Sequence, residues 1–171
     1  MYFVLDVESI GLYGLGFAVG WVVVDETGAT LEEGYLACPH REAVHSASDP
    51  SDLEWVETHV CPHLPDSNCE DLPELYDSFW VAWLAWKQEG AVLVADCAYP
   101  VETNFLRSCV LNDMSRKWEG PYPVVDVSSV LLAKGFNPTK EFDRKENELP
   151  QHNPLCDARQ SARILIETLM L

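Results

Sequence analysis

Four acidic residues stand where apolar segments of the chain end: Asp6, Glu8, Asp96 and Asp157. Asp6 and Glu8 lie two apart in the stretch FVLDVESIG, and alternate residues of a strand point to the same face. Neighbouring carboxylates repel each other and raise each other's pKa unless a cation neutralises them. Oxygen ligands favour a hard divalent ion, Mg²⁺ or Mn²⁺, over zinc. Together the four acids predict a divalent-cation site, although each alone is typical of a solvated strand end or a helix cap.

Short apolar runs predict the strands that position these acids. Residues 2–7 are typical of a central strand, and residues 91–96 of a second buried strand that also ends in an acid. Residues 16–37 predict two strands joined at the turn DETG, where Gly28 supplies the positive φ that a hairpin needs. The stretch YPVVDVS predicts a further strand.

Helices are expected between and after these strands. A short helix in DPSDLEWVETHV would be capped by Asp49 or Ser51, and residues 72–90 predict a long helix closed by Gly90. The stretch YPVETNFLRSCVLND predicts a helix, SVLLAKG a short one, and residues 157–171 a final amphipathic helix that Asp157 opens. This order predicts one α/β domain, residues 1–171, with a mixed sheet flanked by helices.

Composition narrows the class of protein. Hydrophobic residues make up 47% of the 171 residues, which predicts a globular domain with a proper core. We expect no membrane association, because no apolar stretch approaches the length of a transmembrane helix, and no secretory signal, because the start MYFVLD lacks a basic region. The six cysteines are then expected to be reduced thiols of a cytoplasmic protein rather than a disulfide framework.

Charge is unevenly distributed along the chain. The formal net charge is −17, which by itself argues against a nucleic-acid partner. Residues 1–106 hold nineteen acids and two basic residues, whereas residues 107–171 hold nine of each sign. The C-terminal third is therefore the part expected to meet a polyanion, although charge alone favours an ordinary acidic surface.

Three motifs in order resemble the DEDD superfamily of exonucleases. DVESIG resembles the first motif, D-x-E-[T/S]-x-G, and LVADCAYPVETNFL resembles the second, with Asp96 as its acid. HNPLCDA resembles the third motif of the His-type branch, H-x-x-x-x-D-A, with His152 and Asp157. Asn153 takes the position where a tyrosine would indicate the sister branch. The resemblance runs from Phe3 to the last helix and is strongest to small RNase T-like exoribonucleases of bacteria and phages.

The resemblance implies an RNase H-like fold and a two-metal 3′–5′ exonuclease that releases nucleoside 5′-monophosphates. Asp6 would bridge two Mg²⁺ or Mn²⁺ ions, Glu8 and Asp157 would complete the nucleophile's metal site, and Asp96 would hold the second ion through water. His152 would take a proton from the attacking water. Single-stranded RNA or a 3′ overhang is the preferred substrate and DNA the alternative. A homodimer is expected by family analogy alone, and a non-catalytic nucleic-acid-binding protein of the same fold is the rival interpretation.

The same resemblance suggests substrate contacts: Ser9, Gly11, Leu12, Asn104 and Phe105. The backbone at Gly11 and Leu12 would meet the 3′-terminal nucleotide, and Phe105 would stack on its base, although a core role for Phe105 is equally in keeping with its apolar helix.

Other aromatic and metal-binding patterns have competing interpretations. Trp80, Trp83 and Trp86 are spaced for core or dimer contacts, whereas Trp118, beside two basic residues, is the better candidate for contact with single-stranded nucleic acid. The segment 38–69 contains cysteines and histidines, but their spacing fits no common zinc finger or ribbon, so chance placement is favoured over zinc.

Overall fold

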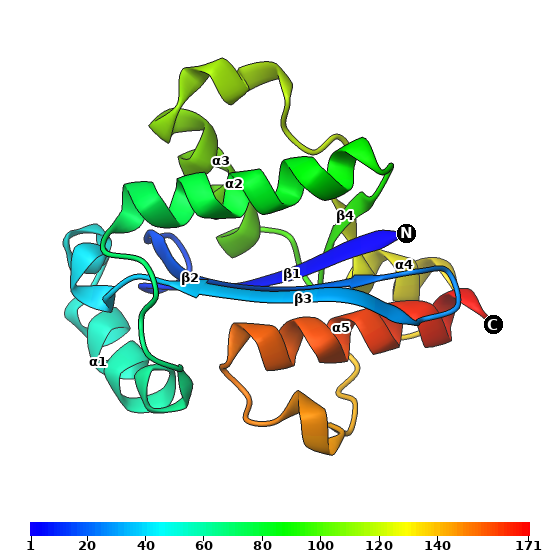
Figure 1. Ribbon diagram of the computed structural model, residues 1–171. Helices are drawn as coiled ribbons and strands as arrows, with labels where there is room; N and C mark the ends of the chain where they lie inside the picture. The colour runs from blue at the N-terminus through cyan, green and yellow to red at the C-terminus, as the bar shows by residue number, and fades with distance from the viewer.

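Apolar strands from both halves of the chain form one mixed sheet at the centre of the computed structural model, which describes residues 1–171 (Figure 1). β1 pairs antiparallel with β2 and parallel with β4, β2 and β3 are antiparallel, and β4 and β5 are parallel. The order across the sheet is β3-β2-β1-β4-β5, where β1 is Tyr2–Ser9, β2 Gly16–Val24, β3 Thr30–Ala37, β4 Val92–Ala95 and β5 Val125–Asp126.

Helices cover both faces of the sheet (Figure 1). α2 and α3 pack on one face over a core cluster of 26 residues, and α4 and α5 pack on the other over a cluster of 11. The α-helices are α1 Pro50–His59, α2 Leu72–Gln88, α3 Val101–Asn112, α4 Val127–Ala133 and α5 Pro154–Leu169. Five 3₁₀ turns complete the structure: η1 His40–Glu42, η2 Val44–Ser46, η3 Cys61–His63, η4 Met114–Trp118 and η5 Glu146–Glu148.

Alternation along β1 divides its side chains between the two clusters. Phe3 and Leu5 are fully buried in the larger cluster under α2, and Val4 is fully buried in the smaller one over α5. Asp6 and Glu8 continue the series of Val4, so both carboxylates point to the face of the sheet that α5 covers. The strand therefore holds two acids on a rigid support beside the last helix.

The parallel pairing of β1 with β4 places their acids at one edge of the sheet. Leu5 lies opposite Ala95 in the register, so Asp6 and Asp96 follow directly on adjacent strands. This geometry explains how segments ninety residues apart in the chain supply one site.

The last helix begins earlier than its sequence pattern predicted. Asn153 caps α5, because its Oδ1 accepts hydrogen bonds from the amides of Leu155 and Cys156, and Pro154 occupies the first turn. The prediction that Asp157 opens the helix is therefore wrong. Asp157 instead lies within the first turn of α5, where its side chain reaches back toward β1.

The predicted α/β class with a mixed sheet flanked by helices is confirmed. Asp49, rather than Ser51, caps α1, and the strand predicted in YPVVDVS is only two residues long because Asp126 caps α4 at once. All six cysteines are free thiols. None of the helices combines the length and apolar character that crossing a membrane requires.

Candidate active site

All five residues predicted to do chemistry line one cavity of about 250 Å³. They come from separate parts of the chain: the end of β1, the end of β4, the loop before α5 and the first turn of α5. The residues that line the cavity are Asp6, Val7, Glu8, Asp96, Arg144, Gln151, His152, Asp157, Gln160 and Ser161.

Within this cavity, Glu8, His152 and Asp157 are close enough to share a metal ion. One ligand atom from each of the three lies within 4.8 Å of the other two. No other three histidine, cysteine or acidic side chains in the chain converge in this way, so the cysteines and histidines of segment 38–69 form no comparable group.

Burial and mutual repulsion raise the pKa values of the four acids in the cavity. The pKa of Glu8 rises to about 8, first because the side chain is buried and then because Asp157 and Glu102 are negatively charged nearby. Burial also raises the pKa of Asp96 and of Asp157. The pKa of Asp6 is raised well above its ordinary value, first by burial and then by four neighbouring carboxylates: Glu8, Asp157, Glu102 and Asp96.

Arg144 is the one lysine or arginine that lines the cavity, and it pairs with Asp157. Its Nη1 donates to the Asp157 carboxylate and also to the backbone carbonyl of Glu148, at 2.9 Å. The second oxygen of Asp157 accepts a 3.0 Å hydrogen bond from the His152 amide. Asp157 thus links the helix to two segments of the preceding loop.

His152 occupies an unusual backbone conformation. Its φ of +63° lies in the left-handed region that residues other than glycine rarely adopt, which makes its placement specific. The ring lies edge-on to the Trp55 ring with 5.1 Å between their centres. Burial lowers the pKa of His152, Asp157 opposes this shift and Arg144 reinforces it. The imidazole is therefore neutral at neutral pH and available to accept a proton.

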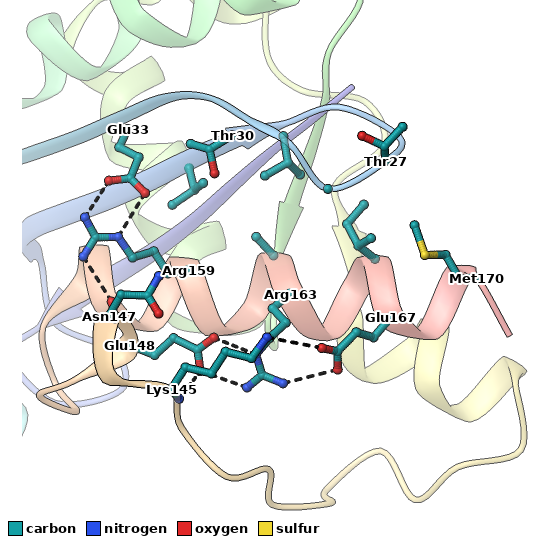
Figure 2. Close-up of a pocket in the computed structure, with 15 residues that line it drawn as sticks. Thr27, Thr30, Glu33, Lys145, Asn147, Glu148, Arg159, Arg163, Glu167 and Met170 are labelled. Carbon is teal, nitrogen blue, oxygen red and sulfur yellow. Dashed lines mark hydrogen bonds and ion pairs between the residues drawn. The ribbon is translucent and has the colours of Figure 1, made fainter.

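Ion pairs hold the segment 145–148, in the loop before α5, against that helix, as Figure 2 shows. Glu148, which is 2% exposed, accepts hydrogen bonds from Arg163 at 2.6 and 2.8 Å and from the Lys145 amide at 2.9 Å. Arg159 donates to the carbonyl of Asn147 and forms two hydrogen bonds to Glu33 on β3. These side chains border a cavity of about 400 Å³, in which Arg159 pairs with Glu33 and Arg163 pairs with Glu148 and Glu167.

A second cavity, of about 320 Å³, adjoins the acidic one and shares Val7 and Glu8 with it. Three of the predicted substrate contacts, Ser9, Gly11 and Leu12, line this cavity. Gly11 has a φ of +66°, and a Cβ there would lie 2.5 Å from Cγ of Asp52, so the turn requires glycine. Val101 and the half-exposed Trp55 complete its wall.

The other two predicted substrate contacts lie elsewhere. Phe105 is 0% exposed, and its ring packs edge-on against Phe79 at 5.0 Å and Tyr76 at 5.6 Å between ring centres. This burial leaves no surface for a base, so the predicted stacking role of Phe105 is wrong and its core interpretation is confirmed. Asn104 is partly buried on α3 and lines neither cavity.

Burial also distinguishes between the core and surface interpretations of the tryptophans. Trp80 and Trp83 are buried core residues, and Trp86 packs against the same core. Trp118 is 80% exposed, with the Lys117 ammonium 5.1 Å from the ring centre, but it borders a cavity at the start of β4, the end away from Asp96.

Sequence reasoning missed three residues of this region: Glu102, Trp55 and Arg144. Glu102 is 6% exposed on the first turn of α3, its charge raises the pKa of Asp6 and Glu8, and its own pKa rises to about 7, chiefly through burial. The signal for it was an acid three residues before Phe105, a spacing that places both side chains on one side of a helix. Trp55 and Arg144 lie in polar stretches that carry no comparable signal.

Comparison with protein-family models found no match, and comparison with curated proteins found none either.

Proposed function

We propose that the protein is a metal-dependent 3′–5′ exonuclease of the His-type DEDD branch, with an RNase H-like fold. The observation that carries the proposal is the convergence of Asp6, Glu8, Asp96, His152 and Asp157 on one cavity, in the roles that the three sequence motifs imply. The strand order, with an antiparallel hairpin beside a parallel pair, is compatible with this fold.

The donor set fits hard divalent cations. Buried carboxylates with raised pKa values lack enough positive charge among their own neighbours, because Arg144 is the one lysine or arginine that lines the cavity. Asp6, Glu8 and Asp157 would hold Mg²⁺ or Mn²⁺, with Asp96 or Glu102 as the further acid. When bound, such ions activate a water and stabilise the leaving oxygen of a phosphodiester.

His152 supplies the proton acceptor in this proposal. Its neutral ring lies beside Glu8 and Asp157, and the 3.0 Å hydrogen bond from its amide to Asp157 fixes the position of the loop. A neutral imidazole with a lowered pKa accepts the proton of the attacking water and remains effective at neutral pH.

The cavity beside Glu8 suits the 3′-terminal nucleoside. Its walls combine apolar side chains with the backbone at Gly11 and Leu12, and the Trp55 ring offers a surface on which a base can stack. Single-stranded RNA is the proposed substrate because the motifs are closest to RNase T-like enzymes, and nucleoside 5′-monophosphates are the proposed products.

The test uses end-labelled single-stranded RNA and DNA of one sequence, incubated with Mg²⁺, Mn²⁺ or EDTA and resolved by length over time. We expect stepwise shortening from the 3′ end that requires the metal. Asp6→Asn and Asp157→Ala are each expected to lower the rate by at least about a hundredfold, since either change removes a ligand from the reacting centre. Glu26→Gln, an exposed acid in the β2–β3 turn, is the matched control and keeps full activity.

Each outcome decides between the alternatives. If DNA is trimmed faster than RNA, DNA is the preferred substrate. If the protein binds oligonucleotides without shortening them, the alternative of a non-catalytic binding protein is favoured. Retained trimming in folded Asp6→Asn or Asp157→Ala protein would contradict the proposed centre.

A further inference from the structure

A polar groove of about 570 Å³ continues from the acidic cavity away from β1. The groove and the acidic cavity share four lining residues, so the two spaces are contiguous: Asp96, Arg144, Gln151 and Gln160. Thr139 and Lys140 line its outer part. The groove therefore offers a second way out of the acidic cavity, distinct from the apolar cavity at Gly11.

Arg144 stands where the groove and the acidic cavity meet, and its guanidinium is only partly used by the protein. Nη1 bonds to Asp157 and to the carbonyl of Glu148, whereas Nε and Nη2 make no hydrogen bond within the chain. The side chain is 19% exposed, so this free edge is held in place yet remains accessible. Two adjacent N–H groups of a guanidinium match two oxygens of a phosphate.

We propose that Arg144 binds a backbone phosphate of the nucleic-acid substrate through Nε and Nη2. This inference rests on the proposed exonuclease function. The scissile phosphate must lie at the carboxylates, and the strand must continue away from its 3′-terminal nucleoside. The phosphate that reaches the junction with the groove is therefore the one immediately 5′ to the scissile linkage.

Basic groups are scarce along this path. Three acids, Asp96, Glu141 and Asp143, line the groove, and Asp6, Glu8 and Asp157 line the adjoining cavity, so a phosphate here depends on the few basic groups present. Lys140 is the other basic residue that lines the groove, and its Nζ lies 4.8 Å from the centre of the Phe142 ring. Arg144 is thus the basic group closest to the reacting centre, and Lys140 extends the positive charge outward.

The test measures removal of the 3′-terminal nucleotide from two RNA oligonucleotides at subsaturating protein. One carries ordinary phosphates, and the other carries a neutral methylphosphonate at the linkage immediately 5′ to the scissile one. For the wild type we expect the neutral linkage to lower kcat/KM about tenfold, the effect of losing one charge-assisted contact. For Arg144→Ala we expect a similar loss on the ordinary substrate and no further loss on the neutral one.

Arg144→Lys and Arg41→Ala provide the comparisons. Lysine keeps the charge without the planar fork, so it is expected to keep part of the sensitivity to the neutral linkage. Arg41 is an exposed residue of η1, and its removal is expected to leave both rates unchanged. Circular dichroism melts of each variant check that the fold is kept.

The linkage-specific readout separates substrate contact from support of Asp157. If Arg144 merely orients Asp157, Arg144→Ala slows both substrates, and the neutral linkage still costs the same factor as in the wild type; that result overturns the proposal. A wild type that trims normally but ignores the neutral linkage overturns it as well, and leaves the exonuclease function standing. A wild type that shortens no oligonucleotide overturns the exonuclease function, and the role of Arg144 falls with it.

Discussion

At the level of single residues, Glu102 is a further acid close to the four that the sequence motifs predicted. Glu102 is 6% exposed, whereas much of the surface of Asp96 is exposed although its carboxyl group is partly desolvated, and Glu102 raises the pKa of Asp6 more strongly than Asp96 does. A buried carboxylate without a basic partner is costly unless it is protonated or binds a cation. Two residues thus compete for the role of the fourth acid.

Paired substitutions distinguish these two acids. If Glu102 is a ligand, we expect Glu102→Gln to lower the rate of metal-dependent trimming by about a hundredfold or more, because a neutral amide then replaces a charged metal ligand near Asp6. Asp96→Asn is expected to have the larger effect if Asp96 holds the second ion. The measurement is the rate of trimming against Mn²⁺ concentration, since loss of a ligand also raises the concentration needed for half-maximal activity. Equal rates for both variants and the wild type would contradict a fourth acid of either kind.

At the level of strands and helices, the contact between β2 and α5 determines where Asp157 lies in the site. Gly20 lies opposite Asp6 in the β1–β2 register, and a Cβ on Gly20 would lie 2.2 Å from the Leu155 nitrogen. The N-terminus of α5 therefore lies directly against the sheet, next to Asp6. This close approach is what brings Asp157 over β1.

Gly20→Ala is expected to push the start of α5 away from the sheet. Overpacking of this kind costs about 1–3 kcal/mol, and the shift of Asp157 is expected to lower trimming at least about tenfold. Gly120→Ala is the matched control, because a Cβ there would have ordinary 3.5 Å contacts with the Tyr122 side chain. Chemical denaturation and the rate of trimming are measured on the same preparations, and a fully active Gly20→Ala protein would show that α5 can lie elsewhere.

The loop before α5 depends on the buried Arg163–Glu148 pair. Burial alone would raise the pKa of Glu148, but the hydrogen bonds from Arg163 and from the Lys145 amide lower it overall. Arg163→Met leaves a buried carboxylate without its partner, which is expected to cost about 3 kcal/mol in the free energy of unfolding. Urea unfolding measures this cost. The double variant Arg163→Met/Glu148→Leu is expected to recover part of the stability, and no recovery would show that Glu148 has other essential partners.

Sequence patterns predicted the strands and helices well, but they predicted poorly how these elements pack against one another. The D-x-E pair on β1 and the acid after β4 were visible because apolar runs end at them, and the parallel register then brings them together. Phe105 lies in the core rather than at the substrate, and Glu102 was not predicted at all, because a helical segment does not show by its sequence alone which face the sheet covers. The contacts of Arg144 and Gly20 could not be predicted, since each depends on a partner more than ten residues distant in the chain.

The charge distribution of the whole molecule also differs from the sequence expectation. Five of the nine basic residues in the C-terminal third form ion pairs with acids of the chain: Arg116, Arg144, Lys145, Arg159 and Arg163. This third is therefore less available to a polyanion than its composition suggested. In the proposed function, contact with nucleic acid would depend on a few individual groups rather than on a basic surface.

The buried carboxylates are expected to make the stability of the whole protein depend on pH and, if the proposed site binds a divalent cation, on that metal. The ordinary pKa of glutamate is 4.5 and that of Glu8 in the fold is about 8, so between these values the folded state binds more protons than the unfolded state. Stability in EDTA is therefore expected to fall as the pH rises from 5 to 8. Thermal melts check this, and Mg²⁺ or Mn²⁺ is expected to raise Tm most at pH 8, where ligands are most easily deprotonated. A Tm in EDTA that rises over this pH range would contradict the inference that the buried carboxylates lack a compensating positive charge.

The two strands and the helix that form the acidic centre emerge from the ribosome at very different times. Asp157 is made about 150 residues after Asp6 and Glu8. A nascent chain can complete the β1–β2 hairpin early, yet it cannot assemble the full ligand set until α5 has left the exit tunnel and docked on Gly20. While the intervening residues are being made, with the growing chain attached to a ribosome and a messenger RNA, the proposed nuclease centre is therefore still incomplete.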